Sequence, residues 1–329
     1  MDKFDQITAY MDALYLQLQH ELKRFNASNK SISSIFIGGG TPSTVEPDLY
    51  KKSFEILRPY FQDDIEITTE ANPNSASSTW LKGMKELGCT RVSFGVQSFN
   101  DTKLKFLGRE HNASQAYEAV KAAKDIGFDH ISLDLIYATK MDTKEILEED
   151  IKTAFSLPID HISAYALTIE ENTLFEAHPE VAKEKLELTN FFIQSIKDKG
   201  FEQYEISNFG KYRCKHNIGY WELDDYMGVG SGAVGMLKNT RFYPTTDIDA
   251  YIENPLDIRE ETLSKEDIKI EKIFLGLRSC VGIDQNELSS SEKKQVDLLL
   301  SENKISLSKN KIYNSDFLLS DEVALFIQA

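Results

Sequence analysis

One stretch decides the fold: Ile35-Phe36-Ile37-Gly38-Gly39-Gly40-Thr41-Pro42-Ser43. Three apolar residues in a row are typical of the end of a buried strand. The three glycines that follow allow positive φ angles and a bare backbone against a ligand. A strand that leads into such a turn is typical of a cofactor site at the carboxyl end of a strand, although a tight turn without a ligand is the alternative. The stretch matches neither the dinucleotide fingerprint nor the P-loop.

Strands and helices alternate through the rest of the first two thirds of the chain. We expect strands at 65–70, 91–97, 131–136, 161–167 and 202–206, and helices at 3–25, 48–59, 79–87, 113–126, 144–155 and 181–199. This alternation predicts a parallel sheet covered by helices, closed or partly closed as a barrel. The fold class is therefore α/β.

The pattern changes after about residue 236. Two helices at 268–277 and 291–300 are followed by short hairpin-like segments at 304–312 and 316–319. We therefore expect two domains: a partial barrel over residues 1–235 and a small α+β domain over residues 236–329.

Composition limits the possible partners. The 329 residues carry a net charge of −16, and such a field repels phosphate backbones, which argues against nucleic acid as a partner. No apolar run reaches the length of a membrane span. Cys89, Cys214 and Cys280 are far apart, with no C-x-x-C spacing, which suits a reducing cytoplasm.

Polar residues fall where successive strands end. Glu70 ends one expected strand, Gln97 ends the next, Asp134 interrupts the third, and Arg109 follows shortly after Gln97. A single polar residue at such a position is usually solvated or a cap. Because the carboxyl ends of parallel strands meet on one face, we expect these four side chains to converge beside the glycine turn. They would bind the hydroxyls and amines of a polar cofactor, with Arg109 pairing with a carboxylate.

These motifs together resemble a known family, the oxygen-independent coproporphyrinogen III oxidase family of radical SAM proteins. The resemblance rests on Gly38-Gly39-Gly40-Thr41-Pro42-Ser43, Thr69-Glu70-Ala71-Asn72-Pro73, Ser93-Phe94-Gly95-Val96-Gln97-Ser98-Phe99 and Leu107-Gly108-Arg109. A further stretch, His216-Asn217-Ile218-Gly219-Tyr220-Trp221, resembles the H-N-x-x-Y-W element of the HemW branch of haem chaperones. The resemblance covers nearly the whole chain.

The resemblance implies cofactors and roles for individual residues. The turn formed by Gly39, Gly40 and Thr41 would hold the methionine part of S-adenosylmethionine. The same resemblance makes the polar contacts to this cofactor Glu70, Gln97, Arg109 and Asp134, with Thr168 and Val234 as weaker correspondences. The complete family form also carries a [4Fe–4S] cluster.

Two departures from the family pattern matter. The family's C-x-x-x-C-x-x-C motif, which precedes the helix matching residues 3–25, is absent, and the three cysteines do not have the spacing to replace it. We therefore expect that the sequence lacks an N-terminal segment with the first barrel strand, and we expect no radical chemistry from the sequence as given. Whether the protein is an enzyme stays open. The smaller departure is Tyr137-Ala138-Thr139-Lys140, where the family usually has G-L-P.

The segment around His216 is the candidate haem site. On a helix, His216, Tyr220 and Trp221 would share a face. That face could stack on a porphyrin with His216 as an axial ligand, or it could be packing that closes the open side of the barrel. Three functions compete: a HemW-like protein that binds haem and passes it to an acceptor protein, a coproporphyrinogen III oxidase that decarboxylates propionates, and a cluster-free relative that keeps the barrel as a binding scaffold.

Overall fold

The computed structural model describes residues 3–170 and 175–329. By contacts the chain forms two compact units. One contains residues 34–48 and 66–213, and the other contains the remaining described residues. The boundary predicted between residues 235 and 236 stays a prediction, because the C-terminal elements belong to a unit that also contains the N-terminal helix.

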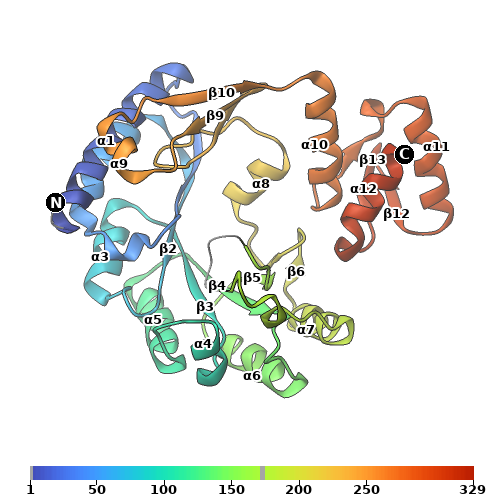
Figure 1. The fold of residues 1–329 in the computed structure, drawn as a ribbon, viewed down its shortest axis with the longest axis horizontal. Coiled ribbons are helices and arrows are strands. Elements are labelled where there is room, and N and C mark those ends of the chain that lie inside the picture. The colour runs from blue at the N-terminus through green and yellow to red at the C-terminus, as the bar shows by residue number, and fades with distance from the viewer. Residues whose placement is uncertain (1–2, 171–174) are drawn as a thin grey trace. The chain divides into compact units, whose positions relative to one another are not determined.

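A curled seven-stranded sheet forms a half-barrel, which confirms the predicted α/β fold (Figure 1). The strand order is β1-β2-β3-β4-β5-β7-β6, so β1 lies at one edge. Strands β2 to β5 pair in parallel, and β7 pairs antiparallel with β5 and β6. The bounds are Ile32–Ile37 for β1, Phe61–Ala71 for β2, Arg91–Gln97 for β3, His130–Tyr137 for β4, His161–Ala166 for β5, Glu202–Gln203 for β6 and Asn208–Gly210 for β7.

Helices follow the central strands and cover the outer face of this sheet (Figure 1). They are α3 (Ser78–Leu87), α4 (Asp101–Phe106), α5 (Ala113–Ile126), α6 (Lys144–Ala154) and α7 (Leu186–Asp198). Ser77, Asn112 and Thr143 cap the amino ends of α3, α5 and α6 through their side chains, which satisfies backbone N–H groups that the helix leaves open. Gly88 and Gly127 end α3 and α5 in the left-handed region that favours glycine.

The two faces of each strand differ in polarity. Ile67, Val92, Leu133 and Ile162 are buried hydrophobic residues. Residues that alternate with them are polar and share the opposite, inner face, since successive strand residues point to opposite sides. These inner residues are Glu66, Thr68, Glu70, Arg91, Ser93, Ser132, Asp134, His161 and Ser163. The half-barrel therefore has an apolar outer layer and a polar interior.

The register of the parallel strands sets which inner residues are neighbours. Glu70 lies opposite Ser93, Ser93 lies opposite Ser132, and Ser132 lies opposite His161. One row of polar side chains therefore crosses four strands. Asp134 lies two residues after Ser132 on β4 and opposite Ser163 on β5. The row and Asp134 form the base of the candidate site.

The second unit combines helices with two small sheets. Its helices are α1 (Lys3–Arg24), α2 (Lys51–Leu57), α8 (Lys215–Trp221), α9 (Ile248–Glu253), α10 (Lys265–Leu277), α11 (Ser290–Ser301) and α12 (Ser320–Gln328). One sheet has the order β10-β9-β8, formed by Ile258–Thr262, Thr240–Pro244 and Gly235–Leu237. The other has the order β11-β13-β12, formed by Ile283–Asp284, Lys311–Asn314 and Ile305–Ser308.

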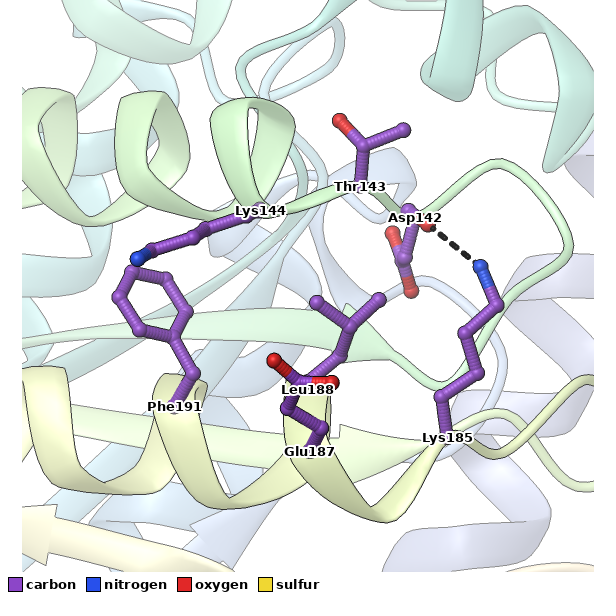
Figure 2. Close-up of a pocket in the computed structure, with 7 residues that line it drawn as sticks. All are labelled: Asp142, Thr143, Lys144, Lys185, Glu187, Leu188 and Phe191. Atoms are coloured by element: carbon purple, nitrogen blue, oxygen red, sulfur yellow. Dashed lines mark hydrogen bonds between the residues drawn. The ribbon is translucent and has the colours of Figure 1, made fainter.

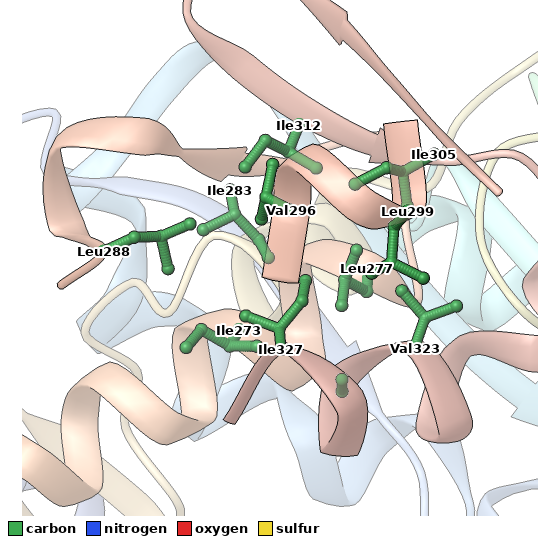
Figure 3. Packing of buried hydrophobic residues seen from close by; sticks show 11 residues of the cluster. Ile273, Leu277, Ile283, Leu288, Val296, Leu299, Ile305, Ile312, Val323 and Ile327 are labelled. Carbon is green, nitrogen blue, oxygen red and sulfur yellow. The ribbon is translucent and has the colours of Figure 1, made fainter. Parts of the chain in front are cut away.

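The C-terminal elements share a hydrophobic cluster (Figure 3). Leu277 from α10, Ile312 from β13 and Ile327 from α12 are fully buried in it. This cluster is the core of the α+β part that the sequence predicts near the C-terminus.

Some predicted elements were wrong in type or extent. The segment predicted as helix from residue 181 begins at Leu186, because Pro179–Val181 forms a separate 3₁₀ turn. The segment 316–319 is not a strand: Asp316 accepts a hydrogen bond from the Leu318 N–H and caps a 3₁₀ turn that leads into α12. Strands β8 to β10 were not predicted at all, since they are short and mostly partly exposed.

Candidate functional site

The glycine turn follows β1 with an open backbone. Gly39 and Gly40 have φ angles of 75° and 54°, in the region that favours glycine. A Cβ added at either position would meet no atom within 4 Å, so the backbone there is bare. The Gly39 N–H donates to Glu70 Oε2 at 3.3 Å. The sequence expectation of a bare turn beside Glu70 is therefore what the structure shows.

Asn72 and Ser43 fix the shape of this turn. The Asn72 N–H donates to Ser43 Oγ at 3.0 Å, and Asn72 Nδ2 donates to Thr41 Oγ1 at 3.4 Å. Ser43 Oγ lies 2.6 Å from Ser75 Oγ. Neither Asn72 nor Ser43 was assigned a role from the sequence. The signal was present, because both residues lie inside the quoted motifs that follow β1 and β2.

Gln97 ends β3 in an unusual conformation. Its φ angle is 67°, and the β3–β4 register shifts between Phe94 and Gln97. Its side chain is buried, and Oε1 has no hydrogen-bond partner among the described residues. A left-handed non-glycine residue costs about 1 kcal/mol, and a buried oxygen without a donor costs about 1–3 kcal/mol. Strain of this kind persists where the surrounding structure enforces it, and it clusters at functional sites.

Asp134 lies at the centre of the polar interior. Ser93 Oγ donates to Asp134 Oδ1 at 3.0 Å. Burial raises the pKa of this carboxyl, and the hydrogen bonds from Ser93 and Ser163 and the charges of Arg91 and Arg109 oppose that rise. Burial also raises the pKa of Glu70, and the charge of Asp134 adds to the rise. Two carboxyl groups therefore share one low-dielectric space.

Arg109 and Gln97 belong to the same region. Burial lowers the pKa of Arg109, and the charge of Asp134 opposes this effect. A Cβ on Gly95 would lie 3.2 Å from Gln97 Nε2 and 3.3 Å from Asn72 Oδ1, so both amides border Gly95. Asn72 also donates to Thr41 Oγ1, so its amide reaches from the surroundings of Gly95 to the glycine turn. The structure thus brings together Gly39, Glu70, Gln97, Arg109 and Asp134.

The two weaker correspondences are placed differently. Thr168 is exposed two residues after β5, and its hydroxyl donates to the Ala166 carbonyl at 3.4 Å. Val234 is half-buried and precedes β8 in the other compact unit. The cofactor roles of these residues stay predictions.

The gathered groups define what this region can bind. Bare backbone N–H groups, two carboxyls, one amide and one guanidinium suit a ligand with both amino and carboxylate groups and with hydroxyls. Gln97 Oε1 is buried and accepts no hydrogen bond among the described residues. A ligand that donates a hydrogen bond to this oxygen would remove the cost of leaving it unsatisfied. S-adenosylmethionine has all of these groups, so the residues present fit it.

The cysteines do not fit an iron–sulfur cluster. Cys89 and Cys214 are buried, Cys280 is half-buried, and Cys89 lies in a different compact unit from the other two. Burial raises the pKa of the Cys89 thiol to about 12, which opposes thiolate formation. Over residues 3–170 and 175–329, no group of three or more His, Cys, Asp or Glu side chains could hold a metal ion. The described residues therefore offer no set of ligands for such a cluster.

The predicted haem residues lie on one short helix, α8, as the sequence spacing indicates. None of its residues is buried. The His216 and Tyr220 rings pack edge to face with their centroids 4.7 Å apart, and Tyr220 packs in the same way against Tyr226 at 4.6 Å. Trp221 ends the helix. His216 thus packs against the partly exposed ring of Tyr220, which in turn packs against Tyr226 in the same unit.

The loop that departs from the family pattern is strained but well connected. Ala138 has a φ angle of 59°, in the region that favours glycine. The Thr139 N–H donates to Asp142 Oδ2 at 2.7 Å, and the Lys183 N–H donates to the Ala138 carbonyl at 2.8 Å. These bonds hold the backbone of the loop in a glycine-like shape without glycine.

A separate surface pocket of about 320 Å³ opens between α6 and α7 (Figure 2). Lys185 Nζ donates to the Asp142 carbonyl at 3.2 Å, and Lys144 Nζ lies 5.0 Å from the centre of the Phe191 ring. The lining residues are Asp142, Thr143, Lys144, Lys185, Glu187, Leu188 and Phe191. Because the predicted cofactor residues do not line it, this pocket is distinct from the candidate site.

Comparisons with known proteins agree with this geometry. The profile of the radical SAM superfamily matches residues 15–154. The chain is 35% identical to "Heme chaperone HemW" of Haemophilus influenzae, over 90% of this chain and 83% of that protein. It is 32% identical to "Heme chaperone HemW" of Bacillus subtilis, over 94% of this chain and 86% of that protein. In fold it is similar to coproporphyrinogen III oxidase (HemN) from Escherichia coli, a radical SAM enzyme, with a TM-score of 0.79, 19% identity and coverage of 99% of this chain and 84% of that one.

Proposed function

We propose that this chain, which belongs to the HemW family of radical SAM proteins, binds haem and passes it to an acceptor protein. The observation that carries the proposal is the His216–Tyr220–Tyr226 arrangement around α8. Imidazole is a common axial ligand of haem iron, and flanking aromatic rings suit a porphyrin face. No residue of α8 is fully buried, so its aromatic side chains keep part of their surface open to a ligand.

S-adenosylmethionine is the second ligand in this proposal. The Gly39–Thr41 turn would hold its amino acid part through backbone N–H groups, and Glu70 and Asp134 would accept hydrogen bonds from its hydroxyl and amino groups. Gln97 and Arg109 complete the set of polar contacts. Bound S-adenosylmethionine would supply a sulfonium group, and the residues named here would only bind and orient it.

The proposal also concerns where in the cell the protein acts and which partner it has. Across the described part of the chain, the helices are too short or too polar to cross a membrane. We propose a cytoplasmic location on a separate ground, because cysteines that form no disulfide are usual in a reducing compartment. Its protein partner would be a haem acceptor.

The test of haem binding is a titration with haemin followed by the Soret band. We expect a saturable spectral change in the wild-type protein and an affinity weaker by about tenfold or more in His216→Ala, because removal of an axial ligand acts directly on the iron. Tyr220→Ala should weaken binding less, since it removes only a packing surface.

The matched control is His178→Ala. His178 is a solvent-exposed histidine, 3.5 Å from Glu180, and it belongs to the other compact unit. Haem affinity should be unchanged in this variant. Identical spectra and affinities in wild type and His216→Ala would remove His216 from the proposed site. Turnover of coproporphyrinogen without stable haem binding would favour the oxidase reading instead.

A further inference from the structure

Arg91 is a buried cation inside the half-barrel. It begins β3, two residues before Ser93, so both side chains point to the inner face. Only 2% of Arg91 is exposed. In register it lies opposite Thr68 on β2 and His130 on β4, one step before the row that contains Glu70 and Ser93. Arg91 therefore lies directly before the carboxyl groups of the candidate site along the strand direction.

His161 and Thr68 hold the guanidinium in place. Arg91 Nη2 lies 3.3 Å from His161 Nδ1, and Nη1 donates to Thr68 Oγ1 at 3.5 Å. A guanidinium can only donate, so His161 Nδ1 accepts and the ring proton lies on Nε2. Nε2 then donates to the Tyr204 hydroxyl at 2.7 Å. Burial lowers the pKa of His161 well below its usual range, and the charge of Arg91 adds to this effect, so the ring is neutral.

We propose that Arg91 is a positioning residue of the ligand pocket: its guanidinium, fixed by His161 and Thr68, stabilises the carboxylate forms of Glu70 and Asp134 before any ligand binds. This inference rests on the proposed binding of S-adenosylmethionine by the half-barrel, and it names the residue that prepares the pocket for it. Arg91 itself touches neither reacting atoms nor, in this proposal, the ligand.

The electrostatic balance in the pocket supports this role. Burial raises the pKa of both Glu70 and Asp134, and the charge of Arg91 opposes the rise in each. Two buried carboxyls close together tend to share a proton unless a cation compensates them. A protonated carboxyl keeps less acceptor capacity for the hydroxyls and ammonium of a ligand. The charge of Arg91 therefore favours the carboxylate form of both groups, which is the form with full acceptor capacity.

Other charged and titratable groups face Arg91 from the strands around it. On the pocket side, Arg109 also stabilises charge on Asp134. Toward the start of the strands, Thr68 donates to Glu66, which also accepts from the Tyr212 hydroxyl at 2.6 Å. These groups are Glu66 and Glu70 on β2, His130 and Asp134 on β4, His161 and Tyr165 on β5, and Tyr204, Arg109 and Tyr212 from the connecting segments; Tyr165 interacts with both Glu70 and Asp134.

The experiment measures the carboxyl groups directly in the ligand-free full chain. Protein labelled with ¹³C at Asp and Glu carboxyls is titrated by NMR, with Glu70→Gln and Asp134→Asn used to assign the two signals. In Arg91→Met we expect both midpoints to rise by about one pH unit, because a nearby Arg lowers a carboxyl pKa by about 1–3 units. Arg91→Lys should restore most of the wild-type midpoints.

Lys103→Met is the matched control. Lys103 is also buried in this unit, but its ammonium pairs with Asp142 at 2.8 Å and Asp150 at 3.5 Å. This variant should lose stability without moving the two midpoints. Unchanged midpoints in Arg91→Met, or the same shift in Lys103→Met, would overturn the proposal. If Arg91→Met does not fold, Arg91→Gln compared with Arg91→Lys decides the same question.

Calorimetric titration with S-adenosylhomocysteine separates this inference from its premise. A wild-type protein that does not bind this probe refutes the proposed cofactor site, whereas the NMR midpoints still decide the role of Arg91. Where the wild type binds S-adenosylhomocysteine, both proteins should lose affinity as pH falls. The loss in Arg91→Met should begin about one pH unit above the loss in the wild type.

Discussion

Replacing Gln97 with glycine should stabilise the ligand-free protein and weaken ligand binding. The φ angle of 67° costs about 1 kcal/mol in glutamine and nothing in glycine. Removing the buried Oε1, which has no partner, recovers about 1–3 kcal/mol. Against this, the loss of two buried methylene groups costs about 1.6 kcal/mol, and the flexibility of glycine costs about 0.5–1 kcal/mol. These terms sum to between about −0.6 and +1.9 kcal/mol, centred on a gain of about 0.7 kcal/mol.

Ligand binding should change in the opposite direction. In the proposed site Gln97 contacts the cofactor, so Gln97→Gly should weaken S-adenosylhomocysteine binding by about tenfold, the equivalent of one hydrogen bond in a buried site. Calorimetry measures this loss. Stability is measured by urea unfolding, followed through the fluorescence of Trp80 in a Trp221→Phe background. Trp80 is buried in the same unit as Gln97, and its Nε1 donates to the Val45 carbonyl at 2.9 Å.

Asn303→Gly is the matched control for backbone strain. Asn303 has a φ angle of 56° and belongs to the other unit, so its replacement should change neither the Trp80 transition nor ligand affinity. A Gln97→Gly protein that is less stable than the wild type would refute the reasoning about strain. A stabilised variant with full affinity would show that the strain at Gln97 does not serve the ligand.

Two further predictions concern stability alone. Ala138→Gly should be nearly neutral, because relief of the left-handed φ angle of 59° gains about 1–2 kcal/mol, whereas the flexibility of glycine and the loss of one buried methyl group together cost about 1.3–1.8 kcal/mol. Urea unfolding of the Trp80 unit that shows a change larger than about 1 kcal/mol in either direction would contradict this balance. The second prediction concerns Glu205. Burial raises the pKa of this carboxyl to about 7, against the hydrogen bond from the Ser207 N–H. Because the folded-state pKa is raised, the stability that Glu205 contributes is fully present below about pH 4.5 and is lost as pH rises through about 7. The loss amounts to about 3 kcal/mol. Glu205→Gln should flatten this part of the stability profile between pH 5 and 8, and an unchanged profile would contradict the assignment.

Much of the candidate site follows from the periodicity of the sequence. The ends of parallel strands meet on one face, so Glu70 and Asp134 could be placed together before any coordinates were known. The glycine turn could be placed beside them because it follows the expected first strand of the sheet. The structure agrees through the bond between Gly39 and Glu70 and the mutual influence of the two carboxyls.

Other features depend on contacts that periodicity does not encode. The φ angle of Gln97 results from the register shift between β3 and β4, which a single strand does not reveal. Strands β8 to β10 form a small sheet of their own and bury few side chains, so they lack a clear alternation of polar and apolar residues. The role of Asn72 arises from a bond to Thr41 across 31 positions of sequence.

The polar interior of the half-barrel is itself an argument for a ligand. Barrel interiors are usually filled by Val, Ile and Leu, which stabilise the fold without any need for partners. Here the inner row carries Glu70, Ser93, Ser132 and His161, and a buried arginine lies beside it. Replacing buried ionic groups by hydrophobic residues of similar volume is often neutral or stabilising, so stability alone does not explain these residues. The outer faces of the same strands carry the expected aliphatic side chains, such as Val92 and Leu133. The concentration of charged and polar groups on the inner face therefore favours a binding role for the interior, independently of any likeness to other proteins.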